Sequence, residues 1–465
     1  MRRPETGYSS MTKSLTEGRI FPLLIKFMLP LLFGNLLQQT YNLIDAAIVG
    51  QFLGENALAG IGASSSVQFL ILGFCMGICC GFAVPIAQRF GAEDFSAMKS
   101  YVFHACVLTV LFAAALTIAC ALLCPLILRL LSTPDDIFAE AYTYLLIIFL
   151  GIPFTLLYNL TAGFLRAVGD SRTPFYFLAL SVCVNIGLDL FFILVLHWGV
   201  AGAAAATILA QGMSGVFCTI YIVKKVPLLH PAAENRILSR FYLKNLAVMG
   251  VPMGLQYSIT AIGSMVMQAS NNSLGTVYVT GFTAAMKLKQ FMMCPFDALA
   301  TSVCTFCGQN LGAGKMDRVK KGILIGVFTG ICYGTAAGLI FIFLGRTLCL
   351  MFVSAESAEI LDAAARYLRC MGYCFWVLGI LNVLRQAVQG LGYAGRAVFS
   401  GAVEMIARCV VSLGFVPLYG YGAICWADQT AWISATCYIL PTCLYCIRKL
   451  ERSRNQAEEV QKDNP

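Results

Sequence analysis

Charged side chains are scarce in this sequence. Asp, Glu, Lys and Arg make up 12% of its 465 residues, whereas hydrophobic residues make up 59%. Soluble domains are about 45–50% apolar and about 25% charged, and the mean hydropathy here is +0.77. A chain with so few charges cannot cover an aqueous surface. The composition therefore excludes a soluble globular protein and predicts a protein that lies in a lipid bilayer.

Histidine and the short motifs of catalysis are also scarce. His104, His197 and His230 are far apart, and the sequence contains no phosphate-binding P-loop, no serine nucleophile elbow and no paired metal motif. We therefore expect a protein that is not an enzyme and that needs no cofactor. An ATP-driven pump is excluded on the same grounds, so the energy for any transport must come from an ion gradient.

Long apolar runs make up most of the sequence. Their continuous apolar character lacks the alternation that membrane β-strands require, which excludes a barrel and predicts helices. The first run is too long for a signal peptide core and no Ala-x-Ala site follows it, so we expect it to be retained. About 20 apolar residues span the hydrocarbon, and we count about twelve such spans: 21–48, 57–85, 101–124, 139–165, 174–196, 200–223, 242–270, 280–308, 322–344, 363–390, 396–418 and 421–446.

Positive charge is concentrated in alternate loops, and this distribution predicts the topology. The other loops carry acidic residues such as Asp135 and Glu356 instead. Because Lys and Arg stay on the cytoplasmic side, we expect a multi-pass protein of the bacterial inner membrane with both termini in the cytoplasm, and no nucleic-acid partner. The basic residues are Arg2, Arg3, Lys13, Arg19, Arg89, Lys99, Arg166, Arg172, Lys224, Lys225, Arg236, Arg240, Lys244, Lys315, Arg318, Lys320, Lys321, Arg396, Arg448, Lys449, Arg452 and Arg454.

Three landmarks recur in the same order in the two halves of the chain. Pro30 corresponds to Pro252, the segment from Gln88 to the one from Gln309, and the segment from Arg166 to the one from Gln389, at nearly constant separations in the sequence. The pattern predicts a parallel repeat of two six-helix bundles. We expect a cytoplasmic N-terminal segment (1–20), an N-lobe (21–223), a cytoplasmic linker (224–241), a C-lobe (242–446) and a cytoplasmic tail (447–465).

Polar residues form a stripe down the first span. Asn35, Gln38, Asn42 and Asp45 are spaced by three or four residues and share one helix face. Because an ionisable group in lipid costs several kcal/mol unless it is solvated or paired, this stripe predicts a polar cavity. The alternative is a packing seam held by amide hydrogen bonds.

A second polar pair lies in the fifth span, where Asn185 and Asp189 are four residues apart on one face. Two carboxylates and an amide around one space could bind Na⁺ through oxygen atoms or share a proton. Together with Asp45 they are the candidate ion-coupling site. The alternative for Asp189 is a side chain that reaches from a helix end to the membrane surface.

The second half offers weaker candidates. Gln256 follows Pro252, and Thr260 extends its polar face, while Met286 could supply a compliant apolar surface. We predict that these residues line a substrate cavity together with Lys287, Asn35, Gln38 and Asn42. Lys287 and Asp297 fit either a substrate path or an internal pair, and Glu404 and Arg408, four apart, fit a structural ion pair.

These ordered landmarks resemble the MATE (multidrug and toxic compound extrusion) family, and in particular its DinF-like prokaryotic branch, over about residues 15–450. The resemblance rests on Leu29-Pro30 with Asp45 and Gly50, the segments 88–92 and 165–174, Asn185 to Asp189, the segment 199–203 with Thr207, and the segment 309–313.

The resemblance implies an antiporter of twelve helices in two lobes. It would export small cationic or amphipathic organic molecules in exchange for H⁺ or Na⁺, with an N-lobe cation site at Asp45, Asn185, Asp189 and Thr207. Family members with a C-lobe ion site carry Glu in helix seven and Asp in helix ten. Here Gln256 and Leu378 stand at those places, so we expect coupling in the N-lobe.

The main alternative is a flippase for lipid-linked oligosaccharides, which belongs to the same broad superfamily. Such a protein would need additional helices or a strongly cationic cavity for a pyrophosphate group, and only Lys287, Lys289, Arg385 and Arg408 could supply one here. An exporter therefore fits the sequence better. We expect it to act as a monomer.

Overall fold

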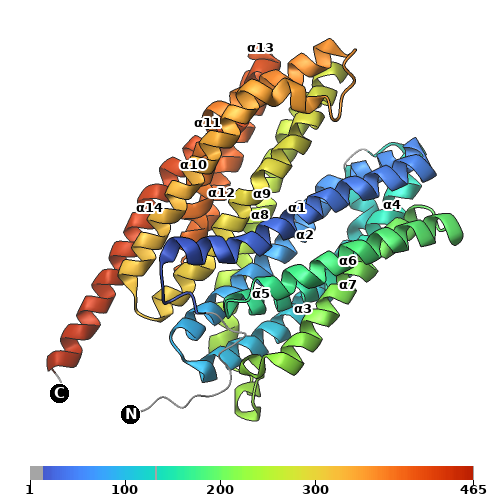
Figure 1. Ribbon diagram of the computed structural model, residues 1–465. Helices are drawn as coiled ribbons and strands as arrows, with labels where there is room; N and C mark the ends of the chain where they lie inside the picture. Colours follow the sequence, from blue (N-terminus) through green and yellow to red (C-terminus); the bar gives the residue numbers. More distant parts are fainter. Residues whose placement is uncertain (1–13, 131–132, 464–465) are drawn as a thin grey trace. The chain divides into compact units, whose positions relative to one another are not determined.

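The computed structural model describes residues 14–130 and 133–463, apart from the side chains of residues 55, 63 and 457–463 (Figure 1). The described chain is helical and contains no β-strand. A helix satisfies its backbone hydrogen bonds internally, as a segment in lipid must. Arg2, Arg3 and Lys13, part of the predicted charge asymmetry, lie outside the described residues.

Eleven described helices are long and apolar enough to cross a membrane, and α4 with α5 forms a twelfth, bent span. The prediction of a polytopic helical protein is thus confirmed. The first set is α1 (Ile20–Leu53), α2 (Glu55–Gly91), α3 (Phe95–Leu130), α4 (Asp135–Leu150), α5 (Ile152–Ala167), α6 (Arg172–Leu190), η1 (Phe191–Val195), α7 (Val200–Lys225), η2 (Pro227–Leu229) and η3 (Ala233–Arg236). The second set is α8 (Arg240–Asn272), α9 (Thr276–Gly312), α10 (Met316–Cys349), α11 (Ala358–Gly390), α12 (Ala394–Cys409), η4 (Val410–Phe415), α13 (Val416–Tyr419) and α14 (Tyr421–Asp463).

The chain folds as two compact units. Unit 1 contains residues 26–258, and unit 2 contains residues 259–463 together with 16–25. Lys315 and Arg318 attach that short segment to unit 2, since their side chains donate to the carbonyl oxygens of Thr16 and Gly18 at 3.0 and 2.8 Å. The division between the units falls inside α8, after Ser258.

The two units repeat one backbone design. Eight of the ten described residues with positive φ form pairs at equivalent corners, and the separation within each pair matches the spacing of the sequence landmarks. Each repeat also contains a π-helical segment, η1 in unit 1 and η4 in unit 2. The pairs are Gly54 and Gly275, Glu93 and Gly314, Gly169 and Gly392, and Gly199 and Gly420.

The fourth predicted span is bent by 45° between α4 and α5. Gly151 stands at the break, and Pro153 follows in the first turn of α5. Proline has no backbone N–H and clashes with the carbonyl four residues before it, so a straight helix cannot continue here. An added Cβ on Gly151 would lie 2.4 Å from Ile208, which shows how closely α7 packs against the bend.

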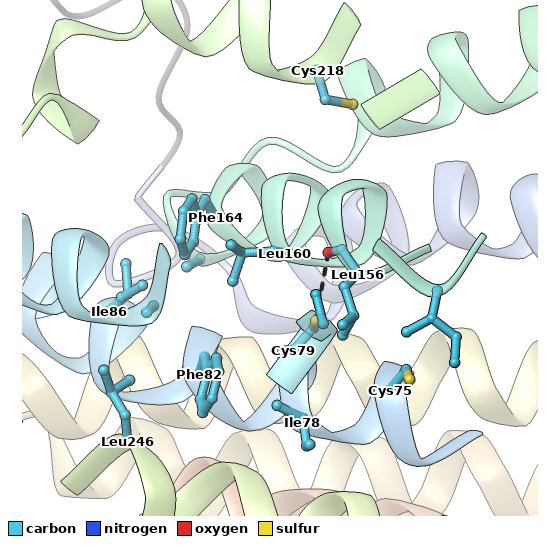
Figure 2. Close-up of a cluster of buried hydrophobic side chains, with 14 of the residues drawn as sticks. Cys75, Ile78, Cys79, Phe82, Ile86, Leu156, Leu160, Phe164, Cys218 and Leu246 are labelled. Carbon is cyan, nitrogen blue, oxygen red and sulfur yellow. Dashed lines mark hydrogen bonds between the residues drawn. The ribbon is translucent and has the colours of Figure 1, made fainter. Parts of the chain in front are cut away.

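Unit 1 is built around an apolar core between α2, α5 and the first half of α8. Figure 2 shows Ile78 and Phe82 of α2 on the side of Leu246 of α8, and Leu156 of α5 beside Cys79. The Cys79 thiol is buried and donates to the Leu156 carbonyl at 3.7 Å. None of the 20 cysteines, all of which lie in the described residues, forms a disulfide, and those in this core behave as small hydrophobic side chains.

Glycines let α2 and α8 approach closely within unit 1. A Cβ on Gly77 would lie 2.6 Å from the Met253 carbonyl, and one on Gly81 would lie 2.5 Å from Gly250 Cα. Small residues at such crossings provide the van der Waals contact that holds membrane helices together. These glycines thus hold α2 against the first half of α8 within unit 1.

Candidate functional site

Asp45 and Asp189 are buried in unit 1 and come from different helices. Asp45 lies in α1, four residues after Tyr41, and Asp189 lies at the end of α6, immediately before η1. Their carboxyl groups are close enough to interact electrostatically, and two neighbouring carboxylates favour a proton or a cation at the pair. The fold therefore brings together two carboxylates that are far apart in the sequence.

Asn185 connects this pair to α7. Its side-chain NH₂ group donates to Asp189 Oδ2 at 3.0 Å, and its oxygen accepts from the backbone N–H of Thr207 at 3.2 Å, in the amide orientation that satisfies both ends. The spacing of four residues places Asn185 and Asp189 on the same face of α6, as predicted. Asn185 thus orients the Asp189 carboxylate.

Thr207 joins the site through a chain of hydroxyl groups. Its hydroxyl donates to the Ala203 carbonyl at 3.1 Å, so the Tyr41 hydroxyl, at 3.0 Å, donates to Thr207. Tyr41 precedes Asp45 by one helical turn and therefore shares its face. The bond ties α1 to α7 beside the two carboxylates.

The surroundings of the site are apolar. Tyr144 of α4 lies near both carboxylates and belongs to a buried cluster with Ile48, Ile148 and Ala203. The Oδ1 atoms of Asp45 and Asp189 are buried and accept no hydrogen bond in the described part of the chain. A buried oxygen without a partner costs free energy, so this pocket favours a proton or cation at the carboxylates.

The oxygen donor set is chemically selective. Carboxylate, amide and hydroxyl oxygens suit a hard cation or a proton rather than a transition metal. Within the described residues, no group of three or more His, Cys, Asp and Glu side chains could hold a metal ion. The candidate ligands for Na⁺ are thus the four residues predicted from the sequence, Asp45, Asn185, Asp189 and Thr207.

The predicted cavity residues are divided between the two units. On α1, Gln38 and Asn42 are exposed and Asn35 is half-buried, whereas Asp45 at the end of the stripe is buried. On α8, Gln256 is buried in unit 1, and Thr260 belongs to unit 2. On α9, Met286 is half-buried and Lys287 is exposed, with its Nζ 5.5 Å from the centre of the Phe352 ring.

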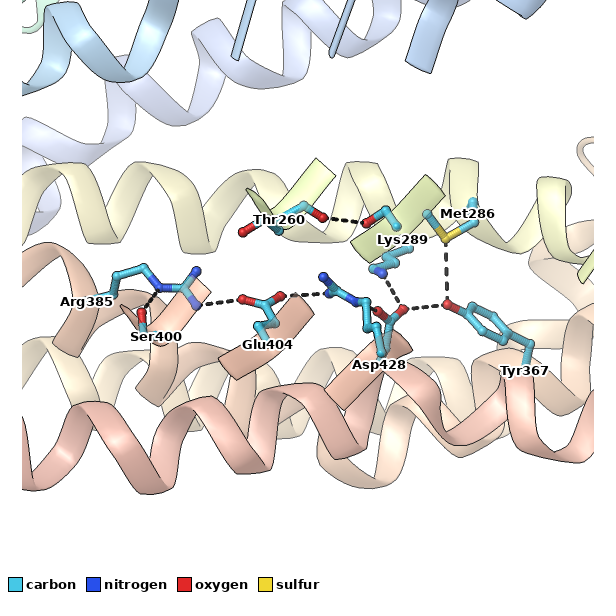
Figure 3. Close-up of polar contacts among 10 residues, drawn as sticks. Thr260, Met286, Lys289, Tyr367, Arg385, Ser400, Glu404 and Asp428 are labelled. Atoms are coloured by element: carbon cyan, nitrogen blue, oxygen red, sulfur yellow. Dashed lines mark hydrogen bonds and ion pairs between the residues drawn. The ribbon is translucent and has the colours of Figure 1, made fainter. Parts of the chain in front are cut away.

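Unit 2 contains a buried network of five charged side chains (Figure 3). Asp428 of α14 accepts from Lys289 at 2.5 Å, from Tyr367 at 2.6 Å and from Arg408 at 2.9 Å. Glu404 of α12 accepts from Arg408 at 2.7 Å and from Arg385 at 2.6 Å. The Glu404–Arg408 pair is thus present as predicted, as part of a larger network.

The network occupies the repeat-related place in unit 2. By the spacing that separates Pro30 from Pro252, position 429 corresponds to Thr207 and position 407 to Asn185, and the network residues Asp428 and Arg408 are their immediate neighbours. The cations in this network are side chains, and both carboxylates are engaged by them. Unit 2 therefore differs from unit 1, where a carboxylate oxygen remains available.

Several residues of these clusters were not predicted. The sequence could have indicated Tyr41, because it precedes Asp45 by four residues and so shares its helix face. Tyr144 could not be identified in this way, because it is far from Asp45 in the sequence and tyrosine is common in membrane helices. Asp428 was the clearest omission, because it is a carboxylate inside the apolar run 421–446. Such a residue is a functional or structural candidate by default.

Comparison with known proteins identifies the family. The MatE family model matches the chain twice, at residues 30–191 and 252–413, so its two copies begin at Pro30 and Pro252. The probable multidrug resistance protein YpnP of Bacillus subtilis is 34% identical over 379 residues, which cover 81% of this chain and 84% of YpnP. YoeA, a second probable multidrug resistance protein of that organism, is 26% identical, with 82% and 84% covered.

A solved structure shows the same fold. It belongs to a multidrug resistance MATE family transporter of the MOP superfamily, with a TM-score of 0.89 and 20% sequence identity over 95% of this chain and 99% of that one. The double family match, the relative at 34% identity and the helical architecture agree with one another. The chain is therefore a multi-pass membrane protein that belongs to the MATE family of multidrug efflux transporters.

Proposed function

We propose that this protein is a secondary active exporter that expels small cationic or amphipathic organic molecules in exchange for H⁺ or Na⁺. The coupling site is Asp45, Asn185, Asp189 and Thr207 in unit 1, and the two lobes alternate in access. The observation that carries the proposal is the buried pair of Asp45 and Asp189, each with a carboxylate oxygen that accepts no hydrogen bond in the described chain.

The coupling follows from electrostatics. Two carboxylates in an apolar pocket repel each other strongly unless a proton or a cation is bound. The ion therefore stabilises the arrangement in which α1 and α6 meet at this site, and its release destabilises that arrangement. Exchange with substrate results when the ion and the substrate favour different arrangements of the same helices. The distribution of Lys and Arg supports a location of both termini in the cytoplasm, at a bacterial inner membrane.

The test is export in cells and in vesicles. In a drug-sensitive bacterial strain, the wild-type protein should lower the accumulation of a cationic dye such as ethidium, and Asp45→Asn should abolish this effect at an equal protein level. Asp362→Asn serves as the matched control, because Asp362 is an exposed carboxylate of α11 paired with Arg346. Export by Asp45→Asn at the wild-type rate would contradict the proposal.

The coupling ion is identified in inverted membrane vesicles. Dye uptake that follows an imposed Na⁺ gradient after the pH gradient is collapsed indicates Na⁺ exchange. Uptake that follows the pH gradient in Na⁺-free buffer indicates H⁺ exchange. Dye uptake that responds to neither gradient would overturn the antiport mechanism.

A further inference from the structure

Asp297 is an unpaired carboxylate near the middle of α9. It lies well inside this 37-residue helix, and its side chain is exposed. In the described part of the chain it takes part in no hydrogen bond or ion pair. The structure thus favours the substrate path over the internal pair that the sequence also allowed. Since a charged group at this depth cannot face lipid tails without a large cost, Asp297 must contact water or a ligand.

The face of α9 that carries Asp297 is polar. Thr283, Gln290 and Asp297 are all exposed and are spaced by seven residues, which is close to two helical turns. Among the described side chains of α9, Tyr278, at 37% exposure, is the single large exposed hydrophobic residue. This stripe of polar side chains is unlike a lipid-facing surface and is suited to contact with water or a polar ligand.

The neighbouring helix α10 has an exposed surface of large apolar side chains, the kind of surface that suits contact with lipid. Its exposed side chains include Leu324, Phe328 and Phe343, which are 67–76% exposed. These side chains are apolar, as contact with lipid requires. The two exposed faces therefore have different surroundings, and that of α9 is suited to a water-soluble ligand.

The buried cations of unit 2 are already engaged. Lys289, on α9 itself, donates to Asp428, and Arg385 and Arg408 donate to Glu404. Lys287 lies ten residues before Asp297, about 15 Å along the helix axis, with its ammonium group at the Phe352 ring. No described Lys or Arg side chain forms an ion pair with Asp297, so a cationic ligand can supply the positive charge that balances it.

We propose that Asp297 binds the positively charged group of the exported molecule and thereby selects monovalent organic cations. This inference rests on the proposed function, for which it names a substrate-specificity residue. Half-buried Met293, one turn before Asp297, offers an adaptable apolar surface for the body of the cation. A neutral molecule gains nothing from the carboxylate, so Asp297 affects cations and neutral compounds differently.

The direct test is binding to purified protein in detergent, measured calorimetrically with tetraphenylphosphonium as the probe. Asp297→Asn should raise the dissociation constant at least tenfold, Asp297→Glu should stay within about threefold of wild type, and Asp362→Asn should bind as wild type. Unchanged affinity in Asp297→Asn overturns the inference. So does the absence of tetraphenylphosphonium binding to the wild-type protein.

Export supplies the second measurement and separates the two proposals. Asp297→Asn should raise the half-saturating concentration of ethidium while leaving export of the neutral dye Nile red within about twofold of wild type. An equal loss for both dyes indicates a structural defect and contradicts the specificity role. If wild-type protein binds tetraphenylphosphonium through Asp297 but exports neither dye, the proposed exporter function fails and the binding inference stands.

Discussion

The hydroxyl of Tyr41 donates a 3.0 Å hydrogen bond to the hydroxyl of Thr207 and so links α1 to α7 at the carboxylate pair. The two residues are far apart in the sequence and meet only through the packing of the helices. Tyr41 therefore supports the candidate ion site by holding α1 against α7 beside the two carboxylates.

Tyr41→Phe should weaken ion coupling without unfolding the protein. The variant removes one hydrogen bond of about 0.5–1.5 kcal/mol, which corresponds to a rise of roughly 2- to 10-fold in the ion concentration for half-maximal export. Tyr176→Phe is the control, because Tyr176 is an exposed residue of α6 at 62% exposure. Identical ion dependence in Tyr41→Phe and wild type would show that Tyr41 does not support the site.

Asn185→Leu should uncouple export from the ion gradient. The variant removes the donor to Asp189 and the acceptor for the Thr207 N–H, while leucine keeps the branching at Cγ. We expect ion-dependent thermal stabilisation of the purified protein to fall to less than half of the wild-type shift, measured with Na⁺ and by varying pH. A full wild-type shift in both series would contradict a role for Asn185 in holding the ion.

Glu404→Gln should destabilise unit 2 strongly. Its loss leaves Arg385 and Arg408 without a shared carboxylate in a buried environment, and breaking a buried pair costs about 3–5 kcal/mol. Asp362→Asn removes an exposed carboxylate from its pair with Arg346 and should cost less than about 1 kcal/mol. Thermal melting in detergent compares the two variants, and equal melting temperatures would argue against a structural network.

Gly81→Ala should destabilise unit 1, whereas Gly62→Ala in the same helix should not. The added Cβ on Gly81 would lie 2.5 Å from Gly250 Cα, while a Cβ on Gly62 would meet no atom within 4 Å. Overpacking of this kind costs about 1–3 kcal/mol, and alanine at an open helical position is neutral or favourable. Melting temperatures and expression levels measure the difference, which should vanish if α2 and α8 can separate freely.

Much of the fold could be predicted from the sequence, because membrane-spanning helices are recognised by their length and apolar composition. The repeat was also visible, since Pro30 and Pro252 begin both copies of the matched family model. The position of the division between the two units, after Ser258 inside α8, depends instead on tertiary packing. Whether Ser258 belongs with one unit or the other depends on packing partners such as Leu70, whose carbonyl accepts from the Ser258 hydroxyl, and periodicity carries no information about them.

The candidate ion site was predictable within each helix but not between helices. Spacing placed Asn185 and Asp189 on one face, and the resemblance to the MATE family added Thr207. Tyr144 and the π-helical turn after Asp189 depend on tertiary contacts and on a local change of hydrogen-bond register. A pattern of residue types cannot reveal either of them.

The buried network of unit 2 has an electrical consequence. Lys289, Arg385 and Arg408 cannot leave the membrane with the transported molecules, and each is held to Glu404 or Asp428. With these residues ionised, the net charge of the network stays constant through a transport cycle. In the proposed exchange, the charge that crosses the membrane would then be that of the ion at Asp45 and Asp189 and that of the substrate. The membrane voltage, which acts on moving charge, would therefore act on the cycle through those two species.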